Sequence, residues 1–193
     1  MRNLLMGEKV YLKKTERDDL KKRVHWINDP DIQATLNYPN WPVSQEQTYK
    51  WFERAAYDMT RRDFSVYTVD SQEYIGSGGF LNIEYPVMKA ELFVMIGEKR
   101  YWGGGYGTDT YRVLINYGFG ELGLKRIYGY QLVDSHGAHK IVDKLRWQRE
   151  GLLRKDLFSH GQIKDRYIVA ILFEEWEMHK DLYGMYDHQS DGD

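Results

Sequence analysis

The sequence of 193 residues contains no cysteine and only four prolines. The absence of cysteine excludes disulfide bonds, thiolate nucleophiles and cysteine metal sites together. A formal net charge of −2 gives no overall basic field for collecting phosphates, so we expect no nucleic-acid partner. No stretch approaches the about 18 apolar residues of a membrane span, and the first residues lack a signal-peptide pattern. These absences predict a cytoplasmic protein without a membrane segment.

Apolar residues make up 42% of the chain, which is enough for one domain with a complete core. No internal repeat, low-complexity tract or linker divides the sequence. We therefore expect residues 1–193 to form a single domain, with a core of about 8–178. The polar end, residues 187–193, is typical of a frayed tail.

The apolar pattern predicts strands and helices in a mixed order. Period-two alternation predicts one strand at the start and three antiparallel strands from Phe64 onward. Between them, one helix ends before Pro30 and another opens at Ser44 with the capping-box sequence "SQEQ". A helix to Gly123, a strand, a short helix and two strands follow. This order indicates an α/β (α+β) fold with a mixed sheet.

The stretch "RYWGGGYGTD", Arg100–Asp109, lies between a predicted strand and a predicted helix. Unpaired amides and the helix dipole make such a loop an anion site, and glycine lets a ligand approach the backbone. A P-loop would need a lysine here, and a dinucleotide fingerprint would need glycine in place of Thr108. A diphosphate site and a glycine-rich turn without a ligand remain as the two interpretations.

The same stretch resembles the pyrophosphate loop of the GCN5-related N-acetyltransferases (GNATs). Within that superfamily it is similar to the branch of ribosomal-protein and spermidine acetyltransferases, where the run Trp-Gly-x-Gly-Tyr-Ala-Thr is common. This sequence has Trp102, Gly103, Gly105, Tyr106 and Thr108 at the matching places, with Gly107 for the alanine. Further similar segments, including "AELFVMI" and "KLRWQREGLLR", follow in the expected order over nearly the whole chain.

The resemblance implies a GNAT fold, with six or seven mostly antiparallel strands, a splay between the fourth and fifth, and about four helices. It implies acetyl-CoA as cosubstrate, with its diphosphate on the loop amides and its pantetheine arm along free backbone of the fourth strand. Trp102 stands where the family usually has Arg or Gln, so its indole is either a ligand contact made by packing or a core aromatic. The implied cofactor-binding residues are Met95, Ile96, Gly97, Trp102, Gly103, Gly104, Gly105, Tyr106, Gly107, Thr108 and Ser135.

Acetyl transfer needs a neutral amine, and a lysine-like amine is almost entirely protonated at pH 7, so a general base helps. Glu91 in "KAELFVMI" is the best candidate, because it precedes the cofactor-contacting end of a central strand. It shares one face of that strand with Phe93 and Met95, so this face is not purely apolar and is expected to border a cleft. The alternative interpretation is an exposed strand glutamate.

The general acid is harder to assign. Family members often have Asn at the start of the helix after the fifth strand and Tyr seven residues later, whereas this sequence has Ser135 and Val142. A serine used in the ribosomal-protein branch is replaced by Ala138. Ser135 is therefore the remaining candidate acid, with a helix cap or a cofactor contact as alternatives. His136 and His139 lack a third ligand, so we expect no metal.

We therefore expect direct transfer of an acetyl group to a primary amine, either a protein N-terminus or a small amine such as a polyamine or aminoglycoside. Tyr38, Trp41 and Asp31, in the long connection between the first two helices, are candidate acceptor contacts. The acidic segment "EEWEMHKD" favours a basic acceptor, unless it is an ordinary solvated face. A homodimer is one candidate assembly. The alternative function is a non-catalytic acyl-CoA-binding or regulatory module that has lost its acid.

Overall fold

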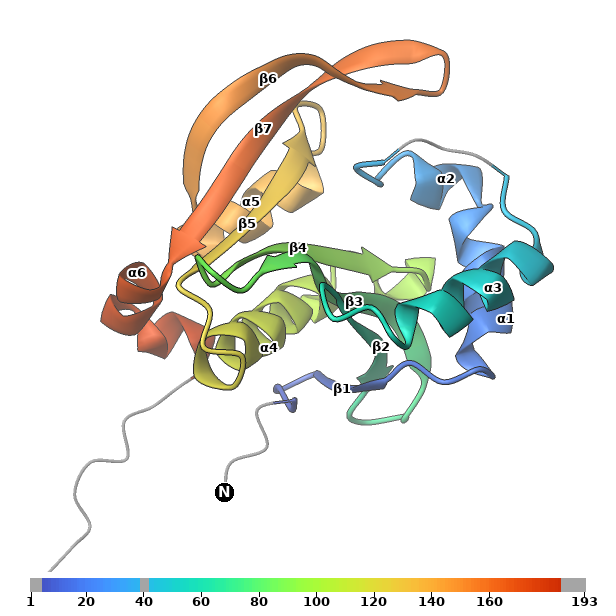
Figure 1. Cartoon of the computed structure of the whole chain (residues 1–193), viewed down its shortest axis with the longest axis horizontal. Helices are drawn as coiled ribbons and strands as arrows, with labels where there is room; N and C mark the ends of the chain where they lie inside the picture. Colours follow the sequence, from blue (N-terminus) through green and yellow to red (C-terminus); the bar gives the residue numbers. More distant parts are fainter. Residues whose placement is uncertain (1–4, 39–41, 185–193) are drawn as a thin grey trace, which may run out of the picture.

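A computed structural model describes residues 5–38 and 42–184 of the chain. Trp41 and the tail at 187–193 lie outside these described residues. One sheet of seven strands has the order β1-β2-β3-β4-β5-β7-β6 (Figure 1), and its only parallel pair within the described chain is β4 with β5. The strands are β1 (Val10–Lys14), β2 (Arg62–Thr68), β3 (Tyr74–Glu84), β4 (Lys89–Ile96), β5 (Arg126–Leu132), β6 (Gln148–Ser159) and β7 (Gln162–Leu172).

The mixed, mostly antiparallel sheet confirms the predicted fold. The described chain also contains six α-helices, where about four were expected. The two additional helices are short: α2 begins at Pro30 inside the long connection, and α6 follows the last strand. The helices are α1 (Asp19–Ile27), α2 (Pro30–Gln33), α3 (Gln45–Ala55), α4 (Tyr106–Gly120), α5 (His136–Lys144) and α6 (Phe173–Met178), with 3₁₀ turns η1 (Lys99–Tyr101) and η2 (Lys180–Tyr183).

Helices cover both faces of the first half of the sheet. On one face, α4 buries Val113, Leu114 and Ile115 in the main core against the strands. On the other face, Trp26 of α1 and Ile32 of α2 pack against residues of β3 and β4. Figure 1 shows α1, α2 and α3 together at one side, and the β6–β7 hairpin and α6 at the other. A cavity between the first group of helices and β4 can therefore form.

Local polar bonds fix α1 and α3. The capping box predicted at Ser44 is present, because the Ser44 side chain accepts from the Gln47 amide and the Gln47 side chain accepts from the Ser44 amide. Such a cap stabilises a helix by about 1 kcal/mol. In α1 the buried Asp19 carboxylate accepts bonds from the hydroxyls of Ser65 (2.6 Å) and Tyr67 (2.7 Å) on β2. This ties the first turn of α1 to the sheet.

The "GSGG" run of β3 marks a close backbone approach. A Cβ atom added at Gly76 would lie 2.2 Å from the Met95 carbonyl oxygen. Register also shifts on the neighbouring strand between Val66 and Tyr67. Only glycine lets β3 and β4 approach so closely at this point.

β4 and β5 part soon after they meet. Their parallel pairing covers only Lys89, Ala90 and Glu91 of β4, with Glu91 opposite Tyr128 as the last pair. β4 continues to Ile96, still paired with β3. Beyond Glu91, one edge of β4 therefore faces an opening instead of another strand, which is the predicted splay between the fourth and fifth strands.

Candidate active site

The glycine loop connects η1 with the start of α4. Gly105 is the N-cap of α4 with φ of 87°, and Gly103 has φ of 75°, so both lie in the left-handed region that favours glycine. Within the described chain, the amides of Gly103, Gly104 and Gly105 donate to no other group. The first-turn amides of a helix also lack intrahelical acceptors. The loop therefore presents a set of unpaired donors at the positive end of a helix dipole.

The side chain of Lys9, the residue before β1, lies beside this loop, and no pattern in the sequence predicts this contact. The Lys9 stem would lie 3.5 Å from a Cβ at Gly105, and its ammonium lies 5.4 Å from the centre of the Tyr106 ring. Asp109, in the first turn of α4, is only 4% exposed and accepts bonds from the amides of Lys9 (2.7 Å) and Val10 (3.0 Å). The carboxylate that would repel an anion is thus engaged with β1, while the lysine adds positive charge.

The unpaired backbone groups of β4 are not the ones that were expected. The Met95 carbonyl points toward β3, as its approach to Gly76 shows, and the Gly97 amide donates to the Ile75 carbonyl at 2.8 Å. Since alternate residues of a strand direct their N–H and C=O groups to opposite sides, Leu92, Val94 and Ile96 face the opening. The predicted free backbone at Met95 and Gly97 is therefore wrong, and the available edge is centred on Val94.

Trp102 connects the glycine loop with this edge. Its indole Nε1 donates to the Ile96 carbonyl at 2.7 Å, and the side chain is 41% exposed. Trp102 is thus neither a core aromatic nor only a packing contact. It joins the loop to the end of β4 and leaves part of its ring on the surface.

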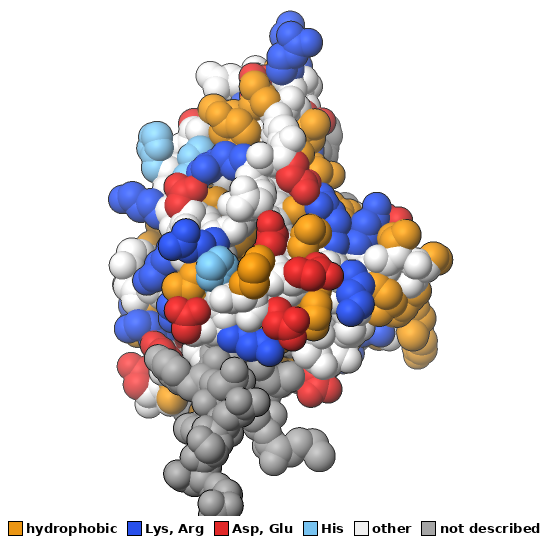
Figure 2. All heavy atoms as spheres, turned by 90° about the vertical axis from the view of Figure 1, so that its left-hand side faces the viewer, with side chains coloured by type: hydrophobic (Ala, Val, Ile, Leu, Met, Phe, Trp, Pro, Cys, Tyr) orange, Lys and Arg blue, Asp and Glu red, His pale blue; other side chains and the backbone are white. Residues whose placement is uncertain are grey.

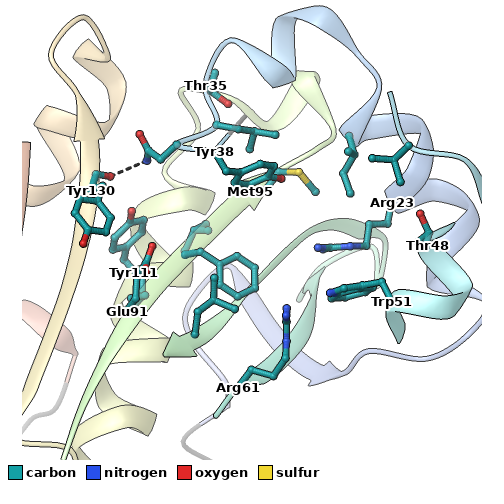
Figure 3. Close-up of a pocket in the computed structure, with 18 of the residues that line it drawn as sticks. Arg23, Thr35, Tyr38, Thr48, Trp51, Arg61, Glu91, Met95, Tyr111 and Tyr130 are labelled. Atoms are coloured by element: carbon teal, nitrogen blue, oxygen red, sulfur yellow. Dashed lines mark hydrogen bonds between the residues drawn. The ribbon is translucent and has the colours of Figure 1, made fainter. Parts of the chain in front are cut away.

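A pocket of about 410 Å³ lies on the face of β4 that carries Glu91, Phe93 and Met95 (Figure 3). This confirms that the mixed face of the strand borders a cleft. The volume lies in the range of small-molecule sites. The lining residues come from α1, α3, α4 and the long connection as well as from the sheet. Those used below are Arg23, Asn37, Tyr38, Trp51, Arg61, Glu91, Tyr111 and Tyr130.

Glu91 lies where the pocket meets the splay, as the last β4 residue paired with β5. Asn82 on β3 donates from Nδ2 to Glu91 Oε2 at 2.9 Å. Burial raises the pKa of the Glu91 carboxyl, against the lowering effects of the Asn82 bond and of the Arg166 charge. A carboxylate with a raised pKa is a better proton acceptor at neutral pH than an exposed one.

The predicted acid positions lie apart from the pocket. Ser135 occupies the N-cap position of α5, yet its side chain makes no cap bond, and it does not line the pocket. Val142 is buried in the main core, and the Ala138 carbonyl accepts from the Gln131 side chain. The His139 ring is bonded to the Leu132 carbonyl.

Tyr111 is a pocket residue that the sequence analysis missed. It extends from α4 and lines the same pocket as Glu91, although α4 covers the opposite face of the sheet. Tyr111 can reach the pocket because β4 and β5 separate beyond Glu91. Burial raises the pKa of its hydroxyl to about 12, so the group keeps its proton at neutral pH. In the sequence, Tyr111 is only one aromatic residue in the first turns of an ordinary amphipathic helix, and nothing else there indicates a place in the pocket.

Of the candidate acceptor contacts Tyr38 and Asp31, only Tyr38 lines the pocket. Asp31 forms an ion pair with Lys99, as does Asp29 at 2.8 Å. The acidic segment forms α6 and η2, which lie on the other side of the molecule from α1, α2 and α3 in Figure 1 and do not line the pocket, so it does not favour a basic acceptor there. Figure 2 shows acidic and basic side chains interspersed on one face of the molecule, without a large area of one sign.

The arrangement of a splayed β4, an amide-rich loop before α4 and a pocket at the splay can be compared with known proteins. Residues 9–148 match the family model "Acetyltransferase (GNAT) domain". The chain belongs to the GNAT family. GNAT proteins are acetyltransferases, which confirms the predicted enzyme class and its acetyl-CoA cosubstrate.

Full-length relatives support this assignment. The chain is 28% identical over 174 residues to the "Uncharacterized N-acetyltransferase p20" of Bacillus licheniformis, covering 89% of this chain and 97% of that one. It is 24% identical over 168 residues to a spermidine N(1)-acetyltransferase of Vibrio cholerae, covering 86% and 95%. A crystal structure of spermidine N-acetyltransferase from Vibrio cholerae, in complex with CoA and spermine, superposes with a TM-score of 0.82 at 22% identity, covering 87% of this GNAT chain and 98% of that chain.

Two features are absent from the described residues. No helix among them is long and apolar enough to cross a membrane. Among the same residues, no group of three His, Asp or Glu side chains is placed to hold a metal ion.

Proposed function

We propose that this GNAT protein acetylates a primary amine bound in the pocket beside β4. One observation carries the proposal: Glu91, with a raised pKa, lies in a pocket at the point where β4 leaves β5. The glycine loop and the free edge of β4 open at the same splay. Binding of an amine and of the cosubstrate would therefore converge on one place.

The residues around the splay fit acetyl-CoA. When bound, this cosubstrate supplies an activated acetyl group on a thioester. The amides of residues 103–108 and the Lys9 ammonium suit its diphosphate, because they combine unpaired donors with positive charge. The amide-rich pantetheine arm suits the edge at Leu92 and Val94, where it would pair as an added strand. Ser135, at the start of α5, stays a proposed cofactor contact and is no longer our candidate acid.

Glu91 would accept the proton that the acceptor ammonium must lose. This role matters most for a lysine-like amine, whose pKa lies near 10.4, and less for an α-amino group near 8. The raised pKa of Glu91 narrows the gap between carboxylate and amine. A backbone amide at the free edge of β4 would donate to the carbonyl oxygen that gains charge during transfer.

Tyr111 would return a proton to the departing thiolate. Its hydroxyl stays protonated at neutral pH and lines the pocket from the α4 side. This assignment replaces the missing family tyrosine, whose position is the buried Val142. The proton can then travel from a side chain that reaches the splay from a different helix.

The test is to incubate the protein with acetyl-CoA and a panel of amines, and to measure thiol release. We expect release well above the rate without amine for at least one acceptor class among peptide N-termini, polyamines, aminoglycosides and amino acids. Tight CoA binding with no release for any amine would instead favour a non-catalytic acyl-CoA-binding module. Absence of CoA binding would contradict both functions.

A further inference from the structure

The pocket carries opposite charges at its two ends. Figure 3 shows Glu91 with Tyr111 and Tyr130 at one end, and Arg23 with Trp51 and Thr48 at the other. Glu91 is the only carboxylate among the described residues that line the pocket, and the two other charged residues are arginines. The balance of charge is therefore positive at the end away from the splay.

The two arginines differ in whether a carboxylate of the protein pairs with the guanidinium. Arg61 forms two bonds with the Asp63 carboxylate, at 2.6 and 2.8 Å, and its guanidinium lies 5.0 Å from the centre of the Trp51 ring. Its charge is thus largely balanced inside the protein. Arg61 helps to fix the position of Trp51 and offers little unpaired charge to a ligand.

Arg23 has no such partner. Its guanidinium lies 4.5 Å from the centre of the Trp51 ring, which holds it in place. Its Nε atom is buried and donates no hydrogen bond, and no carboxylate among the described residues forms an ion pair with Arg23. A partly buried cation with an unused donor is costly unless a ligand satisfies it. The anchored α1 helix, tied by Asp19 one turn earlier, keeps this group at the pocket.

The opposite end offers hydrogen-bond acceptors. Asn37 donates from Nδ2 to the Tyr130 carbonyl at 2.6 Å, and its Oδ1 atom is buried without a partner. Glu91 lines the same end, close to the splay. Both are oxygen acceptors, which is the kind of group that an amine or ammonium needs as a partner. Leu36, Val43 and Phe93 also line the pocket, and their apolar side chains suit a hydrocarbon spacer.

We infer that the acceptor is a primary amine that also carries an anionic group, a carboxylate or a phosphate, bound by Arg23. This inference rests on the proposed function and deepens it. A planar guanidinium pairs with two oxygens of such a group, and stacking on Trp51 presets its plane. A polyamine would bring a second cation to Arg23, and like charges at short range repel each other. Among the acceptor classes considered above, amino acids and related zwitterions fit this pocket and polyamines do not.

The sharpest test uses three acceptors with the same four-carbon chain and different ends: 4-aminobutyrate, 4-amino-1-butanol and 1,4-diaminobutane. We expect kcat/KM for the carboxylate to exceed that for the alcohol by about 10-fold or more, as one charge-assisted pair allows. The diamine should be the poorest. A further comparison of kcat/KM for 3-aminopropylphosphonate and for 4-aminobutyrate tells whether the preferred anion is phosphate-like or a carboxylate.

Arg23→Gln should reduce the preference for 4-aminobutyrate over 4-amino-1-butanol by about 10-fold or more. Arg23→Lys should restore part of it, because the charge returns without the planar fork. Arg54→Gln is the matched control, since Arg54 lies on α3 outside the lining of this pocket and should leave the preference unchanged. Preference for the diamine in the wild type, unaltered by Arg23→Gln, would overturn the inference.

A binding measurement separates this inference from the proposed function. Calorimetric titration of the same three amines into the CoA-saturated protein reports acceptor preference even if no acetyl transfer occurs. Tighter binding of 4-aminobutyrate than of 1,4-diaminobutane without turnover would refute the catalytic proposal and keep the anion site. Turnover with a preference for the diamine would keep the enzyme and refute the anion site.

Discussion

The glycine loop offers its ligand main-chain amides from residues 103–108, whereas the pocket offers side chains from α1, α3, β4 and the long connection. The conformation of the loop backbone, with positive φ angles at Gly103 and Gly105, therefore determines this site. The pocket is a site of side-chain chemistry on a rigid strand. The difference teaches that substitutions in the loop should affect cosubstrate binding, while those in the pocket should affect acceptor choice and rate.

The largest effect is expected from Gly105→Glu. It places a carboxylate beside a bound diphosphate, and like charges this close weaken CoA binding by about 100-fold or more. Equilibrium binding of CoA is the measurement. Gly161→Glu is the matched control, because Gly161 also has a positive φ (74°), has open space around it and lies in the β6–β7 turn. Equal CoA affinity in both variants would contradict the loop assignment.

Glu91→Gln should lower kcat/KM by about 100-fold, as loss of a general base does. In the wild type the rate should fall as the pH drops through the raised pKa of Glu91, and the variant should retain only the titration of the amine itself. Glu84→Gln, an exposed glutamate paired with Lys89, is the control. A variant with an unchanged pH profile of kcat/KM would remove Glu91 from the chemistry.

The same substitution makes a prediction about stability. Because the folded-state pKa of Glu91 is raised, its ionisation opposes folding, and this penalty appears as the pH rises through that pKa. Glu91→Gln should therefore raise the thermal midpoint at pH 7 but not at a pH below the unfolded pKa of about 4.3. A midpoint lowered at pH 7 would mean that the ionised carboxylate stabilises the fold.

Tyr111→Phe should lower kcat by roughly 10-fold and leave KM for both substrates nearly unchanged, because only the proton is lost. Tyr117→Phe, on the same helix and packed against Phe64, should have little effect. Steady-state kinetics with both substrates varied separates these outcomes. A rise in KM for the acceptor with kcat unchanged would make Tyr111 a binding residue only.

The smallest effect is expected from Trp102→Phe, which removes the indole bond to the Ile96 carbonyl but keeps an aromatic ring. One such bond corresponds to roughly a threefold loss of CoA affinity. Since Trp102 only positions the loop against β4, the loss should be far below that of Gly105→Glu. An equal loss would mean that the side chain, and not the backbone, carries the site.

The sequence predicts the backbone site better than the side-chain site, for a physical reason. The loop's glycines, the helix after them and the capping box at Ser44 are local, so each can be read from a few consecutive residues. The run of small residues at Gly76, where β3 and β4 approach closely, is local as well. Long-range partners leave no such signal: Lys9 and Asp109 are joined at the loop although 100 residues separate them.

The sequence predicts that β4 borders a pocket, but not which backbone edge is free or which other side chains line the pocket. Alternation along β4 places Glu91 beside a cleft, but it does not show where the β5 pairing ends, and this decides which backbone edge is free. Nothing local indicates that Arg23 and Trp51 stack, or that Tyr111 passes through the splay. The free edge at Val94, expected at Met95, follows from strand register, which the sequence alone leaves open.

The most direct test of the account is a crystal structure of the protein with coenzyme A. We expect density for the diphosphate against the amides of residues 103–108, with the pantetheine arm along β4 at Val94 and its thiol end near Glu91. A diphosphate bound elsewhere on the molecule, with the glycine loop left empty, would contradict the central claim.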